Sequence, residues 1–214
     1  MTANVVALLP NAGLANKLFV WAKAEVFAEH NGLTASAVGW TYPKLGPLIR
    51  GERSSRQYGR YITSSTASAL GSLASGWIND RIVTEPPCER LGQIDTRSTF
   101  LFRRVPHWSD MFDGLKGQRR QIRSKLLACI REEHSTQLRG LSPPQIAIHV
   151  RRGDFRPLEP DEDFSRVGGV RTPSQYFLNI AVALRSAAGG DVPITVFSDG
   201  TDAELSFLLN MPRT

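Results

Sequence analysis

The chain has 214 residues, of which 41% are hydrophobic and 21% charged, which is typical of a globular protein with a core of its own. No segment approaches the roughly 18 consecutive apolar residues that a membrane-spanning helix needs, and the start lacks the basic residues of a secretory signal, so we expect a soluble, cytoplasmic protein. The chain has 26 Lys and Arg residues against 20 Asp and Glu, a net charge of +6. This charge favours an anionic partner: nucleic acid, a phosphorylated small molecule or an anionic membrane surface.

The first elements follow the order strand, turn, helix. Residues 4–10, "NVVALLP", form an unbroken apolar run that predicts a buried strand. The following residues begin with a glycine-bearing turn and then place apolar side chains at helical spacing. Asn31-Gly32 predicts the end of this helix, and the whole unit is typical of the start of an α/β domain.

The middle of the chain is harder to interpret. Residues 33–84 are rich in turn formers, and the small-residue stretch "TSSTASALGSLASG" is compatible with a loop or with a weak helix. Residues 116–134 predict one amphipathic helix that ends near Ser135. Its apolar stripe consists of Ile122, Leu126, Leu127 and Ile130.

The stretch "RGLSPP" at 139–144 predicts a linker between two domains, residues 1–140 and 141–214. After it we expect a strand at 145–150, a helix at about 173–188 capped by Thr172 or Ser174, a strand at 194–199, and a helix from Asp202. Such a run leaves the second sheet short, which suggests a truncated or unusually short member of a longer family.

The strand at 145–150 runs directly into Arg151 and Arg152. Arginine is costly to bury without an anion, and ligands of open α/β sheets bind beyond the carboxyl ends of the strands. On a strand His149 and Arg151 share a face, so both can address one pyrophosphate, while Arg152 pairs inward with a carboxylate such as Asp154 or Asp199. The alternative is a surface arginine pair in a structural salt bridge with Asp154.

Three stretches resemble, in order, the motifs of the α-1,2-fucosyltransferase family. "HVRRGDF" is similar to its H-x-R-R-G-D-[YF] motif, "NAGLANKLFVWAKAEVFA" to its N-terminal G-G-L-G-N-[QR]-[ML]-F-x-x-A loop and helix, and "VFSDG" to its F-S-D-D segment. The resemblance implies an α/β protein of GT-B type, with two Rossmann-like domains of which the second is apparently incomplete. It also implies an inverting, metal-independent transfer of fucose from GDP-fucose to a hydroxyl of an oligosaccharide or polysaccharide acceptor, with the first domain on the acceptor side.

Carried over by position, the resemblance implies that Arg151 binds the β-phosphate of the donor and stabilises the departing GDP. His149 and Arg152 support it, Ser198 and Asp199 lie near the nucleotide, and the loop from Gly13 to Asn16 faces the cleft from the first domain. The general base is a carboxylate or histidine, and Asp154 is the nearest candidate in the sequence. The resemblance implies no metal and no cofactor. The Asp161 to Asp163 run is a weak candidate for a metal site, because it lies in a proline-punctuated loop rather than after an apolar strand.

The sequence departs from the family pattern at a few positions. Ala12 and Ala15 stand where the family usually has glycine, and alanine tolerates a positive φ poorly. Gly200 replaces the second aspartate of F-S-D-D, and the chain ends before the Ser/Gly-rich segment associated with the donor site. A non-catalytic, anion-binding relic of the fold is therefore the second hypothesis.

A basic nucleic-acid-binding domain is the third hypothesis. Its basis is the arginines from Arg50 to Arg60, which are interleaved with tyrosines. We rank it last, and expect no nucleic-acid partner. Peripheral contact with the inner membrane is a further partner that the basic charge allows.

Overall fold

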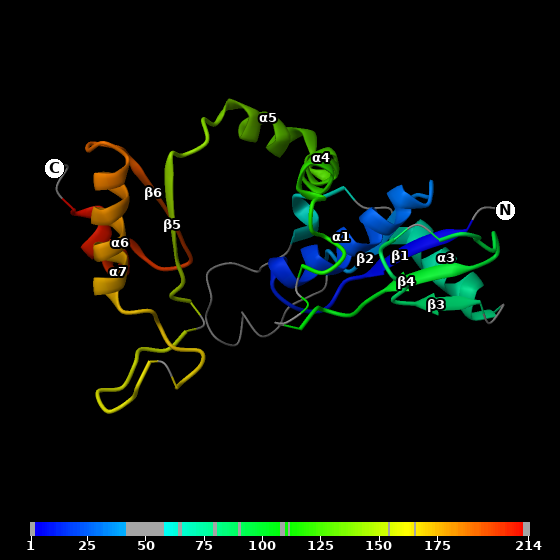
Figure 1. Ribbon diagram of the computed structural model, residues 1–214, viewed down its shortest axis with the longest axis horizontal. Coiled ribbons are helices and arrows are strands. Elements are labelled where there is room, and N and C mark those ends of the chain that lie inside the picture. Colours follow the sequence, from blue (N-terminus) through cyan, green and yellow to red (C-terminus); the bar gives the residue numbers. More distant parts are fainter. Residues whose placement is uncertain are drawn as a thin grey trace. The chain divides into compact units, whose positions relative to one another are not determined.

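The computed structural model describes residues 3–41, 58–63, 66–78, 81–89, 91–107, 110, 112–153, 155–164 and 166–211, apart from the side chain of Arg139. The chain divides into two compact units, Met1–Gly140 and Leu141–Thr214 (Figure 1). The boundary lies within the 139–144 stretch. Both units are α/β, with parallel strands and helices packed on the sheets. Among the described helices, none has the length and hydrophobicity required to cross a bilayer.

The first unit contains a four-stranded parallel sheet in the order β2-β1-β4-β3. The strands are β1 (Asn4–Leu8), β2 (Ala35–Val38), β3 (Ile82–Thr84) and β4 (Thr99–Phe102). Strand β1 was predicted, and β2, β3 and β4 were not located from the sequence. Because all four strands run in the same direction, their carboxyl ends form one edge of the sheet.

Two helices cover opposite faces of this sheet. Successive side chains of a strand point to opposite faces. Val5 packs in the cluster that holds the buried side chains of α1 (Leu14–His30), whereas its neighbour Val6 packs with Leu73 of α3 (Thr66–Ile78). Covering on both faces explains why β1 is an unbroken apolar run rather than an alternating one. Residues 66–76 of the small-residue stretch belong to a helix, α3.

Helix α1 was predicted and has the expected end. Its C-cap is Asn31, and Gly32 follows with φ of 63°, a conformation that glycine adopts at little cost. The ring of Phe27 lies 4.8 Å from that of Phe100 and 5.5 Å from that of Phe102, which fixes the helix over β4. A short 3-10 helix, η1 (Tyr58–Arg60), lies between β2 and α3 in the chain.

The single helix predicted for residues 116–134 is wrong. The structure has α4 (Arg119–Cys129) and a separate α5 (Glu132–Gly140), because Ile130 is extended, with ψ of 135°, and forms a β-bridge with Ile62. The predicted apolar stripe is also only partly correct: Ile122 and Leu126 pack against the core, whereas Leu127 is 42% exposed.

In the second unit, β5 (Ile146–Val150) pairs in parallel with β6 (Ile194–Ser198). Helices α6 (Ser174–Ala187) and α7 (Asp202–Leu209) pack on one face. All four elements were predicted, but neither Thr172 nor Ser174 caps α6 through its side chain: the N-cap is Pro173. On the other face His149 lies directly across from Phe197, which is 53% exposed.

Candidate functional site

The carboxyl ends of β5 and β6 bring several of the predicted site residues together. The hydroxyl of Ser198 donates to the carbonyl of Val150 over 2.6 Å and accepts from the backbone N–H of Gly200 over 2.9 Å. One residue further on, the backbone N–H of Arg152 donates to Oδ1 of Asp199 over 2.7 Å. These contacts bind the two loops to each other just beyond the strands, where ligands of parallel sheets are held.

Two glycines make this close approach possible. A Cβ on Gly153 would lie 2.7 Å from Oδ2 of Asp199, and a Cβ on Gly200 would lie 2.9 Å from Cγ of Arg152. Neither glycine has a positive φ, so the requirement is for space rather than for an unusual backbone conformation. Gly200 is therefore tied to the packing of Arg152, because an aspartate at this position would displace that side chain.

Arg152 is a buried, positioning residue. Arg152 is only 6% exposed. Its guanidinium donates to the carbonyl of Thr172 over 3.4 Å and to Oγ of Ser174 over 3.1 Å. These contacts explain why Ser174 does not cap α6. The guanidinium lies 5.3 Å from the centre of the Phe207 ring, and burial, together with the charge of Arg171, lowers its pKa.

Among the described residues, the guanidinium of Arg152 forms no ion pair with a carboxylate, so the expected pairing with Asp199 is wrong. Asp199 receives the backbone N–H of Arg152, while the guanidinium bonds go to Thr172 and Ser174. Its Nε is buried and has no hydrogen-bond partner within the described residues. Asp154, the other expected partner and the candidate base, lies outside the described residues.

Arg151 and His149 lie on the opposite side from Arg152. Exposure alternates from His149, exposed, through Val150, buried, to Arg151, exposed, and Arg152, buried, so the strand-like alternation continues past β5. The guanidinium of Arg151 stacks over the ring of Phe155 with 4.5 Å to its centre. A cation held in this way is oriented by an aromatic face yet remains open to solvent.

The loop that follows is closed by contacts that the sequence did not suggest. Arg171 donates from its backbone to the carbonyl of Arg156 and from Nε to that of Phe155, each over 2.8 Å. Its guanidinium also pairs with Glu204 of α7 over 2.9 Å. In the sequence, the Thr201-x-x-Glu204 spacing could have indicated that Glu204 lies in the first turn of a helix, because it is the pattern of a capping box, which these residues form at the start of α7.

Two residues of the acidic run in this loop, Glu162 and Asp163, pair with arginines. Glu162 binds both terminal nitrogens of Arg156, one of them over 2.6 Å, and these bonds lower its pKa to about 2. Asp163 pairs with Arg166 over 3.3 Å. In the part of the chain that the structure describes, three or more His, Cys, Asp or Glu never gather in a way that could hold a metal ion.

Of the predicted loop from Gly13 to Asn16, only Gly13 precedes α1, and residues 14–16 form the first turn of that helix in the first unit. Both Gly13 and Asn16 are exposed. Gly13 is the N-cap of α1 and is extended, with φ of −61°. Among described residues other than glycine, Glu85 has the positive φ, so neither Ala12 nor Ala15 is strained. The alanines at these family glycine positions thus cost the loop nothing in backbone conformation.

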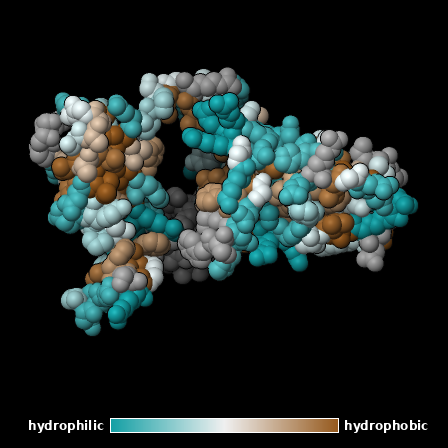
Figure 2. Space-filling model, in the orientation of Figure 1, coloured by the Kyte–Doolittle hydropathy of each residue, from teal (hydrophilic) through white to brown (hydrophobic). Residues whose placement is uncertain are grey.

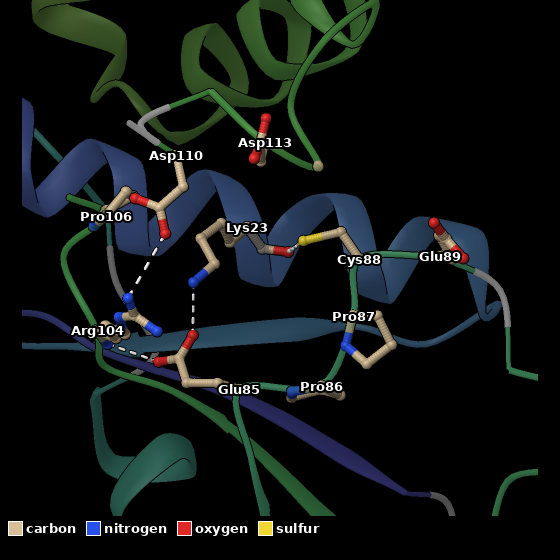
Figure 3. A pocket seen from close by; sticks show the side chains of 11 residues that line it. Lys23, Glu85, Pro86, Pro87, Cys88, Glu89, Arg104, Pro106, Asp110 and Asp113 are labelled. Carbon is tan, nitrogen blue, oxygen red and sulfur yellow. Dashed lines mark hydrogen bonds and ion pairs between the residues drawn. The ribbon is translucent and has the colours of Figure 1, made fainter. Parts of the chain in front are cut away.

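The first unit also has a cavity of about 300 Å³ beside α1, beyond the ends of β3 and β4 (Figure 3). Lys23 and Glu85 point toward each other across it and form an ion pair. Glu85 has φ of 51° and accepts the backbone N–H groups of Arg103 and Arg104. Its carboxylate is thus already occupied by donors from the protein itself.

Comparison of the chain with protein-family models, with characterised proteins and with solved structures gives no match. Chemically, the β5–β6 edge offers an exposed guanidinium, Arg151, on a backbone fixed by the buried Arg152 and by Asp199. This arrangement suits the binding of a small anion such as a phosphate group.

Proposed function

We propose that the chain is a fucosyltransferase-like enzyme of GT-B type that binds GDP-fucose at the β5–β6 edge and transfers fucose to a hydroxyl of a glycan acceptor. The observation that carries the proposal is the difference between two adjacent arginines: Arg152 is buried and hydrogen-bonded within the fold, whereas Arg151 is exposed to solvent.

In the proposed reaction, the bond between the anomeric carbon of fucose and the β-phosphate oxygen breaks, and its electron pair leaves with GDP. The acceptor oxygen bonds to the anomeric carbon from the opposite face, and its proton passes to a carboxylate, for which Asp154 is the candidate. The Arg151 guanidinium neutralises charge that grows on the diphosphate, as a divalent cation does elsewhere. Loss of such a donor costs on the order of 10²- to 10³-fold in rate.

The remaining residues have supporting roles in this proposal. Asp199 and Ser198 fix the loop that carries the arginines, and His149 extends the binding surface on the same side as Arg151. Gly13 and Asn16 of the first unit are further candidates for contact with the donor. The reaction as written needs no metal and no cofactor.

Calorimetric titration of the 214-residue chain with GDP and GDP-fucose tests the proposal. We expect saturable binding that Arg151→Ala weakens by on the order of 10²-fold, the loss of a charge-assisted phosphate contact. Arg166→Ala is the matched control, because Arg166 is an exposed arginine of the same unit and pairs with Asp163. A folded chain that binds neither nucleotide would rule the proposal out.

A non-catalytic anion-binding module is the second candidate. It is favoured by the small size of the second sheet, which has two strands within the described residues. The two candidates differ in one measurement: a module binds GDP with the same dependence on Arg151, but releases no GDP from GDP-fucose when glycan acceptors are supplied.

A further inference from the structure

Helix α4 has one face committed to the fold of the first unit. Ile122 and Leu126 pack against the core. Lys125 reaches the carboxylates of Glu25 over 3.4 Å and Glu29 over 2.8 Å, both on α1. Burial raises the pKa of Glu25, although Lys125 opposes that change. The inward face of α4 therefore has its charges matched, and the rotation of the helix about its own axis is fixed.

The outward face of α4 has a different character. Arg119, Arg120 and Arg123 are exposed, and none makes an ion pair or hydrogen bond through its side chain to any other described residue. Helical spacing places Arg120, Arg123 and Leu127 in one row, and Leu127 is 42% exposed. We call Arg119, Arg120, Arg123 and Leu127 the arginine face. In Figure 2 the surface over α4 is largely hydrophilic, as these arginines require.

The fold does not account for these arginines. Two of them occupy the first turn of α4, where the helix dipole disfavours cations, and this turn contains no acidic residue. The N-cap, Gln118, makes no side-chain capping bond. An anionic partner would offset both unfavourable terms.

We propose that the arginine face of α4 is a docking surface for an anionic membrane. Arginines bind lipid phosphates, while the exposed Leu127 in the same row enters the boundary between headgroups and acyl chains. A soluble polyanion would use the arginines but gain nothing from a leucine. Single-stranded nucleic acid is recognised by arginines interleaved with aromatic residues, and α4, "RRQIRSKLLAC", contains no aromatic residue.

Co-sedimentation of the full chain with vesicles tests this surface. The vesicles contain equal parts of phosphatidylglycerol and phosphatidylcholine, or phosphatidylcholine alone, and are measured at low and at high salt. We expect binding to the anionic vesicles only, weakened by salt. Replacing Arg119, Arg120 and Arg123 together by Gln should lower the partition coefficient about 100-fold.

The matched control replaces three exposed arginines elsewhere, Arg97, Arg103 and Arg166, by Gln. It removes the same charge from the chain and should lower binding by less than about fivefold, if binding depends on the charge of α4 rather than on the net charge of the protein. Leu127→Ser separates a bilayer from a soluble polyanion: it should lower vesicle binding roughly tenfold at low and high salt alike, and leave binding to polyphosphate unchanged.

Equal losses in both triple variants would overturn the proposal, as would vesicle binding that ignores Leu127→Ser. Binding to polyphosphate or single-stranded DNA through the same arginines, without any binding to vesicles, would overturn it as well. If the triple variant does not fold, vesicle binding is measured with the single variants Arg120→Gln and Leu127→Ser, both at exposed positions. Each should weaken that binding, and no change in either would overturn the proposal. The test uses no nucleotide, so its failure leaves the proposed donor site untouched, and failure of the donor site leaves this surface intact.

Discussion

The carboxylate of Asp199 holds the backbone N–H of Arg152 at 2.7 Å, so the loop after β6 fixes the loop after β5. A hydrogen bond between a charged acceptor and a backbone donor contributes about 1.5–3 kcal/mol, and less where the acceptor is exposed, as Asp199 is. We expect Asp199→Ala to lower the free energy of unfolding by about 1 kcal/mol. Asp199→Asn keeps the acceptor oxygen and should cost less in denaturant titrations; equal costs would contradict this role.

Glycine at positions 153 and 200 should be required for packing. Because a Cβ on Gly200 meets the buried stem of Arg152, Gly200→Ala should cost about 1–3 kcal/mol. A Cβ on Gly153 meets the end of the exposed Asp199 side chain, which can move aside, so Gly153→Ala should cost less than Gly200→Ala. Gly168→Ala, where a Cβ meets nothing within 4 Å, serves as the control and should stay within about 0.5 kcal/mol of the wild type. Thermal and denaturant unfolding of the three variants would show the difference.

The sequence predicted best where local patterns agree with the final packing. The end of α1 at Asn31-Gly32 and the strands and helices of the second unit follow from residue type and spacing. It predicted poorly where a distant partner decides. Ile130 fits the apolar stripe of a helix, but it pairs with Ile62, 68 positions earlier, and the helix breaks there.

The candidate site shows the same limit. Alternation along β5 correctly predicted that Arg152 points inward, away from His149 and Arg151. Its partners could not be predicted, since Thr172 and Ser174 reach it only once α6 has packed on the sheet. Strand β4 was missed because its four residues, "TFLF", are too few to show a periodic pattern.

The Glu162 carboxyl should titrate far below its ordinary range. The two bonds from Arg156 lower its pKa from 4.5 to about 2. A depressed pKa in the folded state means that the stabilisation is present above pH 4.5 and is lost as the pH falls toward 2. Carboxyl-carbon NMR should show a midpoint near 2 in the wild type and a clearly higher one in Arg156→Gln, still below 4.5 because the backbone N–H of Glu159 also donates to this carboxylate. An unchanged midpoint in the variant would contradict the pairing.

Both thiols should be slow to react. Burial raises the pKa of Cys88 and of Cys129, which reduces the thiolate fraction at neutral pH, and the thiolate is the reactive form. We expect alkylation of the folded chain to be on the order of tenfold or more slower than that of a small thiol. Unfolding in denaturant should restore the full rate for both, and fast labelling before unfolding would show that the thiols are accessible.

The immobilised side chain of Arg152 has a thermodynamic consequence for its neighbour. The backbone N–H of Arg152 is hydrogen-bonded to Asp199 and its guanidinium to Ser174 of α6, so the conformational entropy of this turn is already lost when the protein folds. An anion that binds Arg151 then does not have to order the backbone of this turn, whose ordering costs roughly 1–2 kcal/mol per residue. Loosening Arg152 would therefore weaken anion binding through entropy, with little change in the enthalpy of the contact itself.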